Sequence, residues 1–133
     1  MERDFHIVKA AYINKGINLI GPVIKNSVLI TGDWQAEYAS GVVVIDHVIG
    51  KAEIHEKMRD VWYVLSGHGA FILGGELDDK ELSRAGEWNA PSISGGEKFS
   101  IFPGDLIDIS PGVAHQVDAR NDRLVALIVK VPI

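Results

Sequence analysis

The sequence predicts a single all-β domain built as an antiparallel sandwich or barrel. The chain has 133 residues, which is the length of one domain. Its apolar segments are short, rich in β-branched residues and bounded by Gly, Pro, Asn or Asp, and this pattern is typical of strands. Gly contributes 14 residues, which indicates many tight turns. Many short strands at close spacing favour a sandwich or a barrel.

Each predicted strand ends where turn-forming residues cluster. The turns fall at 14–16, 31–33, 66–69, 103–105, 111–112 and 121–122. No stretch shows a sustained helical period, so residues 1–30 are expected to form strands that could contact a second subunit. The predicted strands are 6–13, 18–24, 27–31, 41–49, 61–65, 70–73, 99–102, 106–110, 115–119 and 123–131.

Segment 74–97 interrupts this rhythm. It is polar and carries the pairs Gly74-Gly75 and Gly95-Gly96, so a loop insertion is expected there, with at most one helical turn at 81–85. A loop of this length is either functional or a tolerated surface insertion.

Composition excludes several classes of protein. The absence of cysteine excludes a disulfide scaffold, a thiolate zinc site and a cysteine nucleophile. The chain has a net charge of -5 and so lacks the excess of Lys and Arg that is typical of a nucleic-acid binder. No apolar run approaches the ~20 residues of a membrane span, and the charged start does not resemble a signal peptide. We therefore expect a cytoplasmic protein with neither a nucleic-acid nor a membrane partner.

Four side chains form a candidate metal site. Glu53 and His55 are two apart and share one face of a strand, and a tight hairpin over 56–59 would bring Asp60 back across from His55. His115 follows a turn far downstream. Two imidazoles and two carboxylates suit one divalent ion of Fe, Mn, Ni, Co or Zn, and any three of them could form a facial set with open positions. The alternative is a degenerate site in which Glu53 points away.

Residues 50–67, GKAEIHEKMRDVWYVLSG, and 104–115, GDLIDISPGVAH, resemble the two signature motifs of the cupin superfamily. In the first motif Glu53 replaces a His and Asp60 replaces a Glu, and in the second Ser110 replaces a Pro. The residues that match are Gly50, His55, Gly67, Gly104, Gly112 and His115.

This resemblance implies a small single-domain cupin, which is a double-stranded β-helix or jelly-roll barrel with one end-open pocket. It implies a metal held by Glu53, His55, Asp60 and His115, and a homodimer. Cupin activities include dioxygenases, isomerases and lyases, so the fold does not fix the function. We expect a small metalloenzyme acting on a small metal-chelating organic molecule. The alternative is a non-catalytic binding or sensing module with a structural or absent metal.

Four further residues are candidates for the pocket wall. Alternation places Trp62 and Val64 on the face of Asp60, although both could simply fill the barrel. Tyr38 and His47 are candidates for the pocket mouth, with a surface role as the alternative. No residue can be singled out as a catalytic base.

Overall fold

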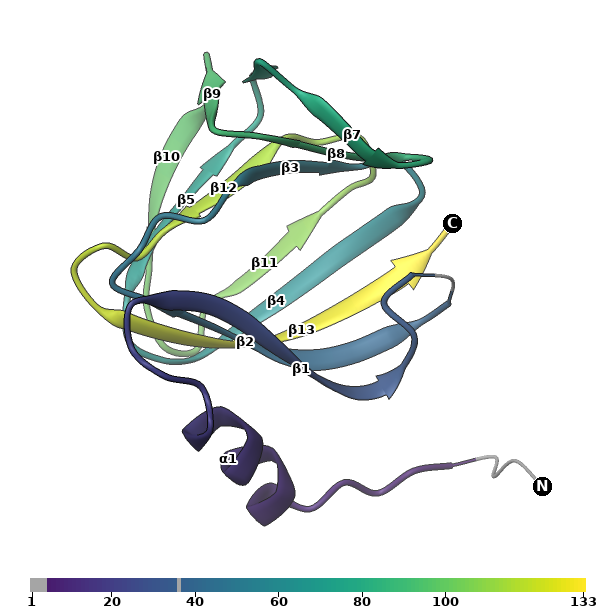
Figure 1. Cartoon of the computed structure of the whole chain (residues 1–133), viewed down its shortest axis with the longest axis vertical. Coiled ribbons are helices and arrows are strands. Elements are labelled where there is room, and N and C mark those ends of the chain that lie inside the picture. Colours follow the sequence, from purple (N-terminus) through teal and green to yellow (C-terminus); the bar gives the residue numbers. More distant parts are fainter. Residues whose placement is uncertain (1–4, 36) are drawn as a thin grey trace.

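Two antiparallel sheets face each other in the computed structural model, which describes residues 5–35 and 37–133 (Figure 1). The five-stranded sheet has the order β1-β2-β13-β4-β11, the six-stranded sheet has the order β10-β5-β12-β3-β8-β7, and β6 pairs with β9. The predicted all-β class is confirmed. The elements are α1 (Ala10–Asn18), β1 (Ile24–Gly32), β2 (Ala39–Asp46), β3 (Ala52–His55), β4 (Met58–Ser66), β5 (Gly69–Leu73), β6 (Glu76–Asp78), β7 (Glu81–Arg84), β8 (Glu87–Ala90), β9 (Ser92–Ser94), β10 (Glu97–Ile101), β11 (Leu106–Ile109), β12 (His115–Asp118) and β13 (Arg123–Pro132).

The main core lies between the two sheets. Along β4 the inward side chains Trp62 and Val64 are buried, whereas Tyr63 and Leu65 on the outer face are exposed. Trp62 meets Phe71 of the opposite sheet edge to face, with ring centroids 5.1 Å apart. This alternation leaves the inner face of β4 free to carry one polar residue, Asp60, into the interior.

The N-terminal segment departs from the prediction. The strands expected at 6–13 and 18–24 are wrong, because residues 10–18 form the helix α1 and residues 19–23 connect it to β1. Ile13, Ile17 and Ile20 recur at helical spacing and pack on the outer face of the five-stranded sheet, over β2 and β13. The strand expected at 27–31 is present in β1. Among the described residues, no helix has the length and apolar character to cross a membrane.

Arg123 fastens α1 to the sheet. Its guanidinium donates to Asp46 Oδ2 at 2.7 Å and to the carbonyls of Ile17 and Ile20 at 3.3 and 3.1 Å. Carbonyls at the end of a helix lack partners within the helix, so Arg123 satisfies them from outside. The hydrogen bonds from Arg123 and then from His47 lower the pKa of Asp46 to about 2.

We expect acid to weaken this connection. Because the pKa of Asp46 is lower in the folded chain, its stabilisation is complete above pH ~4 and is lost as the pH falls toward 2. Asp46→Asn should therefore flatten the decline in the free energy of unfolding over that range, measured by urea denaturation. Asp108→Asn, at an exposed ion pair with Arg59, is the control and should change little. A decline identical to that of the wild type would contradict the role of Asp46.

Segment 74–97 is not a simple loop. It contains β6, β7, β8 and β9, and the helical turn expected at 81–85 is strand β7. Gly75, in the turn before β6, and Gly86, between β7 and β8, adopt φ values of +74° and +79°, a conformation that glycine tolerates best. Because β8 pairs with β3, this segment contributes a wall to the candidate site.

Candidate metal centre

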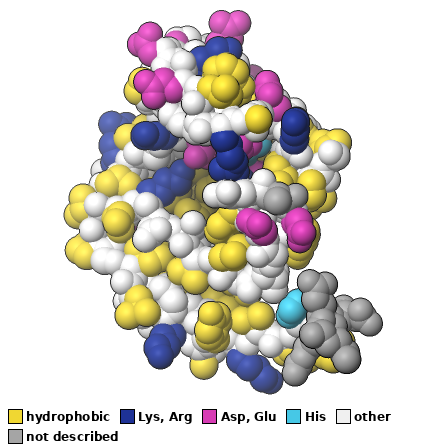
Figure 2. All heavy atoms as spheres, turned by 45° about the vertical axis from the view of Figure 1, so that its right-hand side comes forward, with side chains coloured by type: hydrophobic (Ala, Val, Ile, Leu, Met, Phe, Trp, Pro, Cys, Tyr) yellow, Lys and Arg dark blue, Asp and Glu magenta, His cyan; other side chains and the backbone are white. Residues whose placement is uncertain are grey.

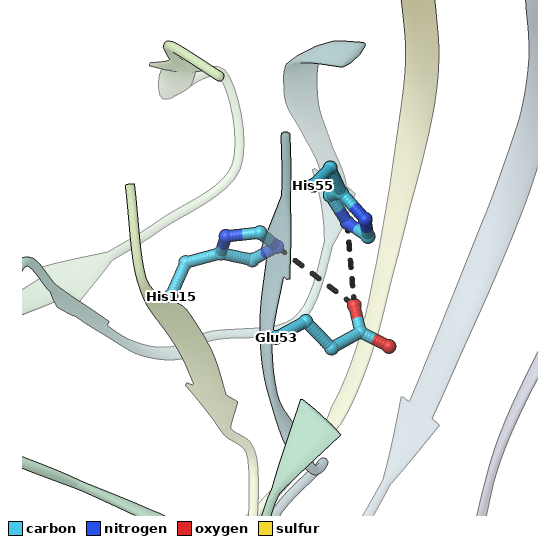
Figure 3. Close-up of side chains that lie close together, drawn as sticks. All are labelled: Glu53, His55 and His115. Carbon is cyan, nitrogen blue, oxygen red and sulfur yellow. Dashed lines mark ion pairs between the residues drawn. The ribbon is translucent and has the colours of Figure 1, made fainter. Parts of the chain in front are cut away.

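Three potential ligands converge on the inner face of the six-stranded sheet. Glu53 and His55 lie on β3, and His115 of β12 lies directly opposite Glu53 in the strand register. The Oε2 atom of Glu53 lies 3.5 Å from His55 Nε2 and 3.8 Å from His115 Nε2 (Figure 3). One ligand atom from each of the three residues lies within 4.8 Å of the other two, so a single ion could contact all three.

His115 presents a free lone pair to this cluster. Its Nδ1 lies 3.0 Å from the carbonyl of Val113, which can only accept, so Nδ1 carries the proton and Nε2 is an acceptor. The residue is 3% exposed, and Nε2 has no hydrogen-bond partner among the described residues. Burial and then the charge of His55 lower the pKa of His115. A buried, neutral imidazole with an unpartnered acceptor is suited to a metal ion.

His55 is oriented by a second carboxylate. Its Nδ1 donates to Glu87 Oε1 at 2.7 Å, across the β3–β8 pair. Metal-binding histidines characteristically have such a partner, which fixes the ring and raises its basicity. Burial opposes protonation of His55, but the hydrogen bonds to Asp60 and Glu53 raise its pKa to about 9. A metal ion would therefore have to displace a proton from this ring.

Asp60 reaches the cluster from the opposite sheet. Its Oδ2 atom lies 3.3 Å from His55 Nε2 and 3.8 Å from His115 Nε2. The predicted hairpin at 56–59 is wrong in one respect: β3 and β4 belong to different sheets, so the connection crosses the barrel and Asp60 approaches from the far side. Asp60 does not belong to the set of three ligand atoms that lie within 4.8 Å of one another.

Lys130 holds Asp60. The two residues are direct partners on β13 and β4, and the lysine Nζ donates to both carboxylate oxygens at 2.9 and 3.1 Å. The same Nζ lies 3.3 Å from His55 Nε2. Burial raises the pKa of Asp60, but the hydrogen bond with His55 and the charge of Lys130 have the larger combined effect and hold the pKa well below its usual value. Asp60 is thus a buried carboxylate that stays ionised beside a lysine.

Glu53 is also ionised. Burial raises its pKa, but the hydrogen bond with His55 and the charge of Lys25 lower it to about 2. The cluster therefore combines carboxylates with two imidazoles, and needs a cation or a proton between them.

The cluster opens into a pocket of about 220 Å³. Of the predicted wall residues, Trp62 lines this pocket, and Val64 lies in the core at 1% exposure. The other two predicted residues, Tyr38 and His47, are not among the described residues that line the pocket. Tyr38 is 49% exposed, and His47 Nδ1 pairs with Asp46 Oδ1 at 2.7 Å. Sequence reasoning missed several lining residues: Lys25, Trp34, Arg84, Glu87 and Lys130.

No protein-family model matches the chain, and no curated protein matches it in sequence. Solved structures do match. A cupin superfamily protein from Desulfitobacterium hafniense is similar with a TM-score of 0.61 and 10% identity, over 100% of this chain and 95% of that one. A protein with a double-stranded β-helix domain from Klebsiella pneumoniae is similar with a TM-score of 0.57 and 18% identity, over 84% and 78%.

The DMSP lyase DddQ of Ruegeria pomeroyi is similar with a TM-score of 0.58 and 14% identity. The match covers 80% of this chain, which spans 46% of the lyase. At these identities the likeness concerns the fold. The chain has the double-stranded β-helix fold of the cupins, as the two sequence motifs predict.

Proposed function

We propose that the protein is a mononuclear metalloenzyme that acts on a small metal-chelating organic molecule. The observation that carries this proposal is the convergence of Glu53 Oε2 with two imidazole Nε2 atoms. That of His115 is buried and has no hydrogen-bond partner in residues 5–35 and 37–133. These atoms repel one another unless a cation or a proton lies between them, and a metal ion can take the place of the proton on His55. Two imidazoles and a carboxylate fit Fe, Mn, Co, Ni or Zn, so the residues present suit the group.

Each residue has a distinct role in this proposal. Glu53, His55 and His115 hold the ion, and Glu87 orients His55. Asp60 is the fourth ligand, which binds only when Lys130 turns away. A bound divalent ion would supply Lewis-acid activation of a chelated substrate. The apolar part of the pocket wall, which includes Trp34 and Trp62, would limit the water around that substrate.

One observation favours a second candidate function. The Lys130 ammonium lies 3.3 Å from His55 Nε2 and already supplies a positive charge to the cluster. With this lysine in place of a metal, the pocket could serve as a metal-free binding or sensing site for a small molecule. Metal content after purification without chelator separates the two candidates.

The predicted homodimer and the cytoplasmic location remain proposals. Dimerisation is supported by apolar side chains left exposed on the outer face of the five-stranded sheet, where Tyr63 and Leu106 are direct strand partners. Sedimentation of the full chain would test it.

The metal proposal is tested by calorimetric titration of metal-free protein with Mn²⁺ and Zn²⁺. We expect one ion per chain, and we expect Glu87→Gln to weaken binding by about 10- to 100-fold, the usual effect of losing an outer partner of a ligating histidine. Glu56→Gln is the matched control, because Glu56 receives a hydrogen bond from Trp88 in the same region but does not line the pocket. The absence of binding by the wild type, or equal effects of the two variants, would contradict the proposal.

A further inference from the structure

We infer that the substrate is a small organic anion that chelates the metal while its carboxylate groups lie between Lys25 and Arg84. This inference rests on the proposed function. Lys25 belongs to β1 and Arg84 to β7, which are edge strands of the two sheets, and both side chains line the pocket. On the face drawn in Figure 2, Lys and Arg side chains gather around a hollow.

The first argument is the charge of the pocket wall. The wall carries three basic side chains, Lys25, Arg84 and Lys130, and three carboxylates, Glu53, Asp60 and Glu87. With neutral histidines these charges cancel, so a bound divalent ion leaves two positive charges uncompensated. Charge that is partly removed from water is costly unless it is paired. A ligand with one or two negative charges therefore completes the site better than a neutral one.

The second argument is the availability of the two basic groups. Lys130 is committed to Asp60, but no described carboxylate lies within ion-pair distance of the Lys25 ammonium. Arg84 approaches Glu87 only at 3.8 Å and is 45% exposed. Lys25 also lines an adjoining groove of about 570 Å³, together with Lys51. Both groups can thus receive an anion that enters from this side.

The third argument is the small size of the pocket and the mostly apolar character of the rest of its wall. Trp34 lies against the backbone at Gly41, where an added Cβ would come within 2.5 Å of its ring, so the lack of a side chain at Gly41 lets Trp34 cover β2. Trp62 also lines the pocket, and its buried indole N–H has no acceptor among the described residues. A pocket of about 220 Å³ is smaller than the ~300–1,000 Å³ of drug-sized sites, so the ligand has few heavy atoms.

The test compares malonate with malonamide, which have the same number of heavy atoms but differ by two negative charges. The Mn²⁺ affinity of each protein is measured first. Each Mn²⁺-loaded protein is then titrated with malonate and with malonamide in a calorimeter, and its Mn²⁺ content is measured again afterwards. We expect malonate to bind the wild type at least 10-fold more tightly than malonamide. Lys25→Met and Arg84→Met should each weaken malonate binding about fivefold or more and leave malonamide unchanged. Lys98→Met removes the same charge on β10, away from the pocket, and should have no effect.

Two failures are distinguishable. If the wild type binds Mn²⁺ but binds both probes equally, or if Lys25→Met behaves like Lys98→Met, the inference is overturned and the metal proposal stands. If the wild type binds no Mn²⁺ before any probe is added, the proposed function is overturned, and the inference that rests on it falls as well.

Discussion

Lys130→Met is expected to bind divalent metal at least 10-fold more tightly than the wild type, and to be less stable without metal by about 3–5 kcal/mol. Asp60 is 1% exposed, so loss of its lysine partner leaves a buried carboxylate that retains only His55 as a close positive partner. The same change frees Asp60 to become a fourth ligand and removes a positive charge close to the ion. A unit charge at ~4 Å contributes about 4 kcal/mol at an effective dielectric constant of ~20, which exceeds the ~1.4 kcal/mol of a tenfold change in affinity.

The measurement is chemical denaturation with and without Mn²⁺, together with calorimetric titration. Lys130→Arg is the control, because it keeps the charge and should not raise the metal affinity. An unchanged affinity in Lys130→Met would mean that Lys130 does not keep Asp60 from the metal.

His115→Leu should weaken metal binding by more than the ~100-fold upper range for an outer-shell partner, because it removes a ligand itself. The metal-free protein should keep its stability or gain up to about 1 kcal/mol, since an unsatisfied buried acceptor is costly and an apolar group of similar size is not. Metal binding is thus expected to weaken at this position, while the stability of the metal-free chain is not expected to fall.

The neighbouring residue provides the contrast. Gln116 is buried on the other face of β12 and donates to the carbonyls of Gly50 and Pro91 at 2.9 and 3.1 Å. Gln116→Leu should therefore destabilise the protein without changing its metal affinity, measured by the same two experiments. If His115→Leu lowers stability as much as Gln116→Leu and leaves metal binding intact, His115 has only a packing role.

The sequence was sufficient to predict the strands that build the core, because β2, β4 and β13 are apolar, β-branched and bounded by turns. It was also sufficient to select Glu53, His55 and His115, which the structure brings together. Helix α1 was missed because its packed face has only Ile13 and Ile17, with Ile20 just beyond its end, which is too short for a clear period.

The remaining errors concern contacts between distant parts of the chain. Strands β7 and β8 border the pocket and solvent, so they lack the apolar alternation that predicts a strand. Because these strands were not predicted, the position of Glu87 beside His55 was not predicted either. Lys130 was visible as the one charged residue in the apolar run 124–132. Its pairing with Asp60 depends on the register between strands 70 positions apart, which local sequence does not specify.

The pairing of His115 with Glu53 across β12 and β3 also has a consequence for folding kinetics. The two residues are 62 positions apart, so the chain must close a long loop and align both strands before their ligand atoms meet. A bound ion would therefore meet its complete set of ligands only after β3 and β12 have paired. Its stabilisation would fall on the native state more than on the transition state, so it would slow unfolding more than it would speed folding. For this chain a metal would prolong the lifetime of the folded barrel more than it would help to build it.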